Sequence, residues 1–148
     1  MILETNNKTV EVVLKTRKIV RVANLLKVKS FEDVFFKAIQ EKDIETLSKM
    51  LLIFCEIDGK ECFKNASDVQ DFIDDYKKEK NKSYNDIFNE LAEVINEEGF
   101  FIKKMTKEEM KEMISSPLSG INTQELVQKS AEKAITKIAE EQFNGFQA

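Results

Sequence analysis

Apolar and polar positions alternate over residues 9–12, and the pattern continues to Leu14 except at Val13. Val10, Val12 and Leu14 share one side of an extended chain, and residues 6–7, both Asn, separate this run from the apolar residues 2–3. A period of two is typical of a strand with one buried face, and an Asn pair between two such runs is typical of a tight turn. The pattern therefore predicts an N-terminal β-hairpin, which must pack on other elements because two strands alone are marginally stable in water.

From about residue 16 the apolar positions recur every three or four residues, which is the period of a helix with one buried face. We expect a short helix over residues 16–26, whose buried face carries Ile19, Val20, Val22, Ala23 and Leu26. Its opposite, solvent-facing side would carry Arg17, Lys18 and Arg21. This helix opens the helical part of the chain.

Four better-marked helices follow, each preceded by a side chain that can accept from the free N–H groups of the first turn. The expected caps are Ser30, Asp43, Ser67 and Ser83. The helix after Asp43 is apolar over most of its circumference through Cys55, which predicts a central position. Residues 77–82 read as a polar connection, and Gly99 ends the last of the four helices, after which residues 100–101, both Phe, would fold back on the core.

The chain after residue 102 has a different pattern. Thr106 and Glu109 have the spacing of a capping box ahead of a short helix, which a break at residues 115–120 ends. A long helix is then expected to about residue 143, with a thin apolar stripe that includes Leu126, Val127, Ile135 and Ile138. These four residues are our candidate partner-binding set. Three partners remain open for the stripe: the core of this chain, a second copy that would make a homo-oligomer, and another protein.

Together these elements predict a mainly α fold. A short N-terminal β-hairpin packs on a bundle of about five to seven helices, and a C-terminal helix either protrudes or docks. We expect residues 1–101 to form the hairpin and helical core, and residues 102–148 to form a C-terminal helical extension with a hinge at 115–120.

The amino-acid composition excludes several classes of protein and of functional site. The 148 residues are 42% hydrophobic and 34% charged, which suits a folded domain of ordinary size, and the longest wholly apolar run covers only residues 50–55. We expect no membrane partner. The chain has no His, which excludes imidazole catalysis and His metal ligation. Met1–Asn6 lacks the pattern of a secretory signal, so we expect a cytoplasmic protein with its two cysteines reduced.

Charge is unevenly distributed along the chain. The net charge is −4, yet residues 12–31 contain no acid and carry +6, so the remainder carries −10. The basic stretch consists of Lys15, Arg17, Lys18, Arg21, Lys27 and Lys29. We interpret it first as a solvated face that pairs with the molecule's own acids, and second as a patch that steers an acidic partner. The acidic balance argues against nucleic acid as the main partner.

No catalytic or cofactor site emerges from the motifs. Asp58-Gly59-Lys60 resembles the middle of a calcium loop, but the first ligand position would be Phe54, so we expect a plain turn. The four glycines are isolated, which does not suit a phosphate-binding loop. Cys55 lies near a helix C-terminus with no base available to activate it. We therefore expect no enzyme, no metal and no cofactor.

The order of the predicted elements along the chain can be compared with that of known families. It comprises the hairpin ending Val10-Glu11-Val12-Val13-Leu14-Lys15, the Arg17 to Leu26 segment, Ser30-Phe31-Glu32-Asp33, the Leu47 to Phe54 helix, the helix Ser67-Asp68-Val69-Gln70-Asp71-Phe72-Ile73-Asp74-Asp75-Tyr76, the Tyr84 to Ile95 helix and Gly99-Phe100-Phe101. Over residues 1 to about 101 this order resembles the tail assembly chaperones of long-tailed phages and prophages of Gram-positive hosts. The resemblance rests on order and pattern, with no invariant motif.

The resemblance implies a function and its partners. Such a chaperone coats the tape measure protein, keeps that long apolar chain soluble, and delivers tail tube subunits during virion morphogenesis. It is absent from the finished virion and has no active site. Two alternatives stay open: a structural tail, baseplate or tail-like bacteriocin component, and a small regulator that binds nucleic acid through the Lys15–Lys29 stretch.

Overall fold

The structure is a computed structural model that describes residues 1–115, and within this range the chain is mainly helical. The helices are α1 (Thr16–Leu26), α2 (Phe31–Glu41), α3 (Ile44–Phe54), α4 (Ala66–Lys80), α5 (Tyr84–Glu97) and α6 (Lys107–Ser115). The strands are β1 (Ile2–Glu4), β2 (Thr9–Val12), β3 (Cys55–Ile57) and β4 (Lys60–Glu61). The predicted fold class, an N-terminal hairpin with a helical bundle, is confirmed for this part of the chain.

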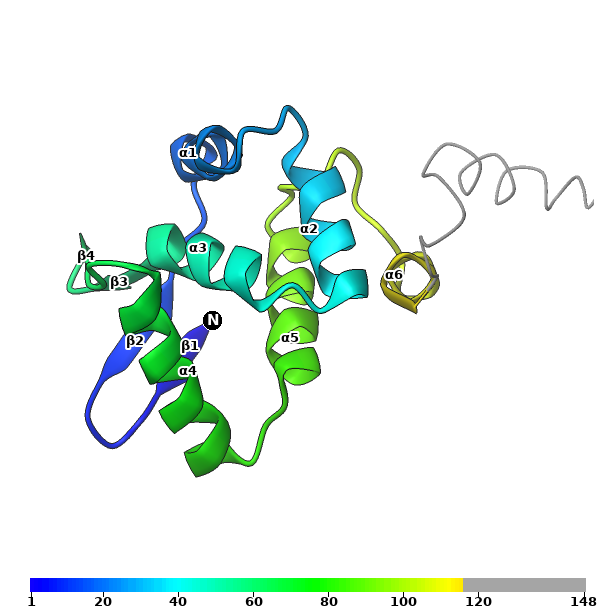
Figure 1. Cartoon of the computed structure of the whole chain (residues 1–148). Coiled ribbons are helices and arrows are strands. Elements are labelled where there is room, and N and C mark those ends of the chain that lie inside the picture. Colours follow the sequence, from blue (N-terminus) through cyan, green and yellow to red (C-terminus); the bar gives the residue numbers. More distant parts are fainter. Residues whose placement is uncertain (116–148) are drawn as a thin grey trace, which may run out of the picture. The chain divides into compact units, whose positions relative to one another are not determined.

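The N-terminal hairpin forms half of a larger antiparallel sheet. β1 pairs with β2, with Leu3 opposite Val10, and β2 pairs in turn with β3, with Val12 opposite Cys55. β4 completes the order β1-β2-β3-β4 (Figure 1). Leu3, Val10 and Val12 are buried, as the alternating pattern predicts. The hairpin is therefore supported by a second hairpin as well as by helices.

The second hairpin corrects the prediction of a helix that runs through Cys55. α3 ends at Phe54, and Cys55 already has extended dihedral angles of φ −80° and ψ 134°. Asp58 and Gly59 have positive φ values of 52° and 79°, the conformation of a two-residue hairpin turn whose twist matches the flanking strands. The expected turn is present, and it joins two strands that the sequence pattern did not predict.

Side-chain caps fix most of the helix starts. Ser30 accepts from the N–H of Asp33 at 3.1 Å, and Asp43 accepts from the N–H of Thr46 at the same distance. Ser83 forms a full capping box at the start of α5. These three predicted caps are confirmed.

The fourth predicted cap was wrong. Asn65, not Ser67, caps α4 by accepting from the N–H of Asp68 at 3.0 Å. Both positions have an acceptor with a polar residue three places later, so spacing alone did not separate them. α4 also continues through residues that we expected to form a connection, and ends where Asn81 adopts a left-handed conformation with φ 55°.

α3 is the central helix, as its apolar circumference predicts. Leu47, Met50 and Phe54 are fully buried. The helix packs against α1, α2, α4 and β2, and it crosses the middle of the view between α1 and α4 (Figure 1). This arrangement makes α3 the element through which the sheet and the other helices share one core.

The segment after α5 returns to the same core. Gly99 has φ 80°, and Phe101 then packs with its ring centroid 4.9 Å from that of Phe36. Asn96 clamps the next turn, donating to the Met105 carbonyl at 3.0 Å and accepting from the Met105 N–H at 2.8 Å. Met110 of α6 is buried, and the compact unit runs from Met1 to Ile114. The predicted helix beyond residue 120 lies outside the described residues.

Candidate interaction surface

The sequence predicts two sets of partner-binding residues, and the structure describes one of them. Leu126, Val127, Ile135 and Ile138 lie outside the described residues. The six cations of the basic stretch all lie on α1 or directly beside it, in the order Lys15, Arg17, Lys18, Arg21, Lys27 and Lys29. The structure divides this second set into paired and exposed members.

Lys18 lies in the interior, which corrects its predicted place on the solvent face. Its side chain is 3% exposed and forms an ion pair with Glu56 of β3, which is 11% exposed. Lys18 Nζ also donates to the carbonyl oxygen of Phe54 at 3.2 Å. A buried ammonium group needs such partners, because removing an unpaired charge from water is strongly unfavourable. Lys18 therefore fastens α1 to the end of α3 and to the sheet.

The Phe54 carbonyl has a position that suits this contact. It belongs to the last residue of α3, where carbonyl groups lack partners within the helix. The N–H of Val13 donates to it at 2.9 Å, and Lys18 Nζ supplies the second donor. The sequence contained a signal for this burial: Lys18 precedes the fully buried Val22 by four residues, so the two share one helix face.

Arg21 is also paired, but at the surface. Its guanidinium contacts the Glu61 carboxylate of β4, and one of the two contacts measures 3.4 Å. This hydrogen bond lowers the pKa of Glu61 and raises that of Arg21. Both side chains are about half exposed, so water screens the pair and its contribution to stability is small, about 0–1 kcal/mol.

The other four cations are exposed. Lys15, Arg17, Lys27 and Lys29 form no ion pair with the residues of the described range. The first interpretation of the basic stretch, pairing with the molecule's own acids, thus holds for Lys18 and Arg21 alone. A cationic surface remains around α1.

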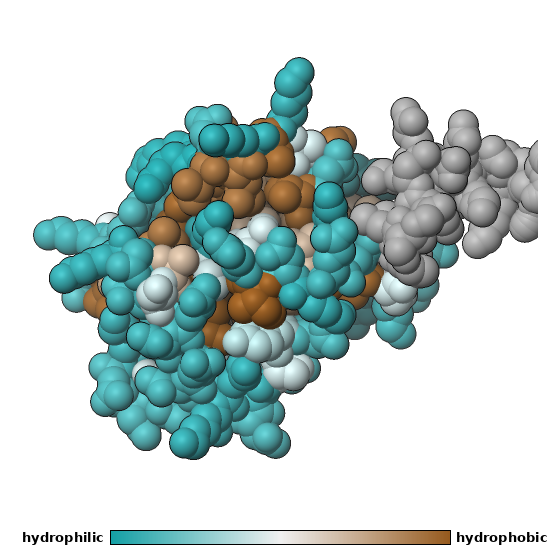
Figure 2. Space-filling model, in the orientation of Figure 1, coloured by the Kyte–Doolittle hydropathy of each residue, from teal (hydrophilic) through white to brown (hydrophobic). Residues whose placement is uncertain are grey.

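Apolar side chains share that surface. Val20 and Leu25 of α1 are 51% and 46% exposed, although Val20 was predicted to be buried. The view in Figure 2 shows a brown area over the region where Figure 1 places α1 and the start of α2, edged by hydrophilic residues. Exposed apolar groups that gather in one area, with arginine beside them, are features of a protein-binding surface.

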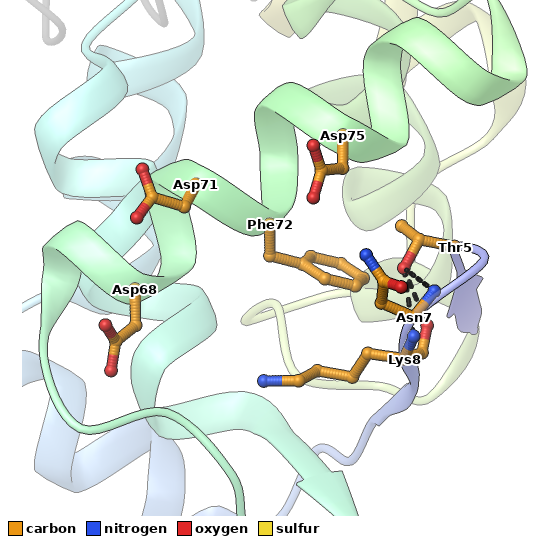
Figure 3. A pocket seen from close by; sticks show the side chains of 7 residues that line it. All are labelled: Thr5, Asn7, Lys8, Asp68, Asp71, Phe72 and Asp75. Atoms are coloured by element: carbon orange, nitrogen blue, oxygen red, sulfur yellow. Dashed lines mark hydrogen bonds between the residues drawn. The ribbon is translucent and has the colours of Figure 1, made fainter.

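A second feature is a cleft of about 220 Å³ between α4 and the loop that joins β1 to β2. Three aspartates of α4 line one side, the loop lines the other, and the Phe72 ring lies between them (Figure 3). Thr5 fixes the loop by accepting from the N–H groups of Asn7 at 3.3 Å and Lys8 at 3.1 Å. The cleft is bordered by Asp68, Asp71, Asp75, Thr5, Asn7, Lys8 and Phe72.

The chemistry of this cleft is that of a solvated polar surface. Asp71 and Asp75 are exposed, and Asp68 accepts from the N–H of Lys64 at 3.1 Å. The Lys8 ammonium lies 4.9 Å from the centre of the Phe63 ring. Its positive charge partly offsets the negative charge of the three aspartates. Within residues 1–115, no group of three or more Cys, Asp or Glu side chains is placed to hold a metal ion.

The two cysteines are free thiols, as predicted. Burial raises the pKa of the Cys55 thiol well above its ordinary value, and burial also raises the pKa of Cys62, which is half-buried. A nucleophilic cysteine needs a lowered pKa. The pKa of each thiol is shifted in the opposite direction.

Comparison with models of known protein families, with curated proteins and with solved structures gives no match. Within the described range, no helix has both the length and the apolar character needed to cross a membrane. Its exposed cations and apolar side chains make the surface around α1 the candidate site.

Proposed function

We propose that this chain is a phage tail assembly chaperone of the cytoplasm, which binds and solubilises the tape measure protein and helps to recruit tail tube subunits. The observation that carries the proposal is the order of elements over residues 1–101. A two-stranded N-terminal hairpin, the short basic helix α1, the apolar central helix α3 and the Gly99 turn into Phe101 occur in the order on which the resemblance rests.

The surface of α1 supports the proposal physically. A protein that keeps an apolar helical chain soluble must offer apolar contacts on a scaffold that stays hydrated. Val20 and Leu25 provide exposed apolar side chains, and charged residues make up 34% of the sequence. Binding of this kind needs no catalytic group.

Co-expression tests the proposal. The chain is produced together with the tape measure protein encoded in the same genome, and the soluble fraction is assayed by affinity pull-down in moderate salt. We expect the tape measure protein to become soluble only in the presence of this chain and to elute with it. An unrelated acidic helical protein of similar size, expressed at the same level, is the control.

Two results would contradict the proposal. The first is a tape measure protein that stays insoluble and does not co-elute. The second is recovery of this chain as a stoichiometric part of purified tail particles, which is the outcome expected of a structural tail or baseplate component.

A further inference from the structure

The helix α1 has more apolar surface than the core covers. Six of its eleven residues are apolar, and of these only Val22 is fully buried. Ile19, Ala23 and Leu26 are half-buried, whereas Val20 and Leu25 are exposed. The last two contribute apolar area to the surface of the domain.

The angular positions of these residues around the helix axis show how far its apolar surface extends. At about 100° per residue, Val20 and Leu25 stand at opposite borders of an apolar arc of roughly 220° centred near Leu26. A helix that packs on a core by one face needs an arc of about 100° or slightly more. The excess lies on both flanks of the buried face, at the edges of the outer side that carries Arg17 and Arg21.

The charges around α1 specify what that element would be. Arg17 and Arg21 lie on the outer side of the helix between the two borders, and Lys15, Lys27 and Lys29 lie at its ends. The sequence from residue 12 to residue 31 contains no acid, and Glu61 neutralises Arg21 only. A complementary partner therefore combines apolar side chains with carboxylates.

We propose that α1 is a docking surface for an amphipathic segment of a partner protein, in which apolar side chains that contact Val20 or Leu25 lie beside Asp and Glu side chains that face the cations. The apolar contacts supply most of the affinity, and the cations select an acidic flank and raise the association rate. If the partner is the tape measure protein, the inference names the chemistry of its binding segment and to that extent rests on the proposed function.

A nucleic acid fits this surface less well. Two of the six cations are already engaged, since Lys18 is buried with Glu56 and Arg21 is paired with Glu61. The exposed apolar side chains between the remaining cations have no role in binding a phosphate backbone. An acidic amphipathic segment uses both kinds of side chain.

Two synthetic peptides test the proposal on the full chain. Both are amphipathic helices of eighteen residues with the same leucine stripe, one flanked by Glu and the other by Lys, each labelled for fluorescence polarisation. We expect the Glu-flanked peptide to bind at least about tenfold more tightly at low salt. The difference should shrink in 1 M salt, where screening acts over about 3 Å.

Matched variants locate the binding surface. The double variant Val20→Gln, Leu25→Gln should weaken the Glu-flanked peptide by about tenfold or more, since it removes two exposed apolar contacts. Ile2→Gln is the control, because Ile2 is 65% exposed but lies on β1. Arg17→Glu should reduce the preference for the Glu flank, whereas Lys104→Glu, an exposed change beyond α5, should not.

Four outcomes would overturn the proposal. Equal binding of both peptides would show that the surface does not select acidic flanks. Unchanged binding by the double variant would show that the peptide does not bind at α1. Loss of peptide binding in the presence of a short DNA duplex, with the duplex released by Arg17→Glu, would assign the surface to nucleic acid instead. A wild-type dimer that the double variant converts to a monomer would assign it to a second copy.

These results are separable from those of the co-expression test. Peptide selection by α1 together with no binding to the tape measure protein supports the docking surface and contradicts the proposed function. Binding to the tape measure protein that survives the double variant contradicts the docking surface and leaves the proposed function standing.

Discussion

Replacing Lys18 tests the buried ion pair that joins α1 to the sheet. Lys18→Met keeps most of the apolar stem, which continues to fill the space between α1 and the end of α3. It removes the ammonium group, so Glu56 is left without its partner and the Phe54 carbonyl keeps only its contact with Val13. The change therefore isolates the charge from the packing.

The expected loss follows from the burial of both groups. Breaking a buried ion pair by removing one partner costs about 3–5 kcal/mol, because the remaining charge is desolvated without compensation. Glu56 keeps 11% of its side-chain exposure, so we take the lower end, about 3 kcal/mol. The double variant Lys18→Met, Glu56→Leu removes both charges and should lie within about 1 kcal/mol of the wild type.

Urea unfolding followed by circular dichroism at 222 nm measures these differences. With an m value of about 1.5 kcal/mol/M, a loss of 3 kcal/mol lowers the midpoint by about 2 M. The control is Lys49→Met, which breaks the exposed pair of Lys49 with Glu45 and should change stability by only about 0.3–0.5 kcal/mol. If Lys18→Met cost no more than Lys49→Met, the reasoning about burial would be refuted.

Three further predictions concern other parts of the molecule. Gly59→Ala should lower stability by about 1 kcal/mol in urea unfolding, because Ala is strained at φ 79° even though the space beside the residue is open; unchanged stability would contradict the assigned turn. In labelling with a thiol reagent at neutral pH, Cys62 should react first and Cys55 only when the chain unfolds, because Cys55 is buried; equal rates would contradict that burial. Glu61 has a lowered pKa in the folded chain, so the stability it adds is present above its unfolded pKa of about 4.5 and is lost as the pH falls through the folded value. Arg21→Gln should flatten this small acid dependence in unfolding curves recorded between pH 3 and 6.

The sequence was most informative where structure depends on neighbours along the chain. The β1–β2 hairpin follows from alternation, and the starts of α2, α3 and α5 follow from one acceptor each, at Ser30, Asp43 and Ser83. These features involve contacts within about four residues, for which spacing is enough. The central position of α3 also follows from the sequence, because apolar residues cover most of the circumference of this helix.

Predictions failed where the deciding partner is distant in sequence. Lys18 was assigned to solvent because it is charged, and only the fold brings Glu56 and the Phe54 carbonyl to it. β3 and β4 have three and two residues, too few for a period to show, although the Asp-Gly turn between them was visible in the sequence.

The surface around α1 also combines features set by neighbours along the chain with features set by distant residues. The basic stretch was identified from charge alone, but which cations pair and which stay exposed depends on the sheet that carries Glu56 and Glu61. The exposure of Val20 also depends on tertiary packing, since its spacing fits the buried stripe of α1 as well as its border.

The two hydrogen bonds to the Phe54 carbonyl affect how this part of the molecule opens. The carbonyl receives hydrogen bonds from Val13 and Lys18, and it lies where α3 passes into β3 without a connecting loop. No hinge separates the helix from the strand, so opening this junction requires α1, the sheet and α3 to separate together. We expect the Val13 amide to exchange with solvent deuterium only through global unfolding, and a partner bound at α1 to slow exchange at amides it does not touch.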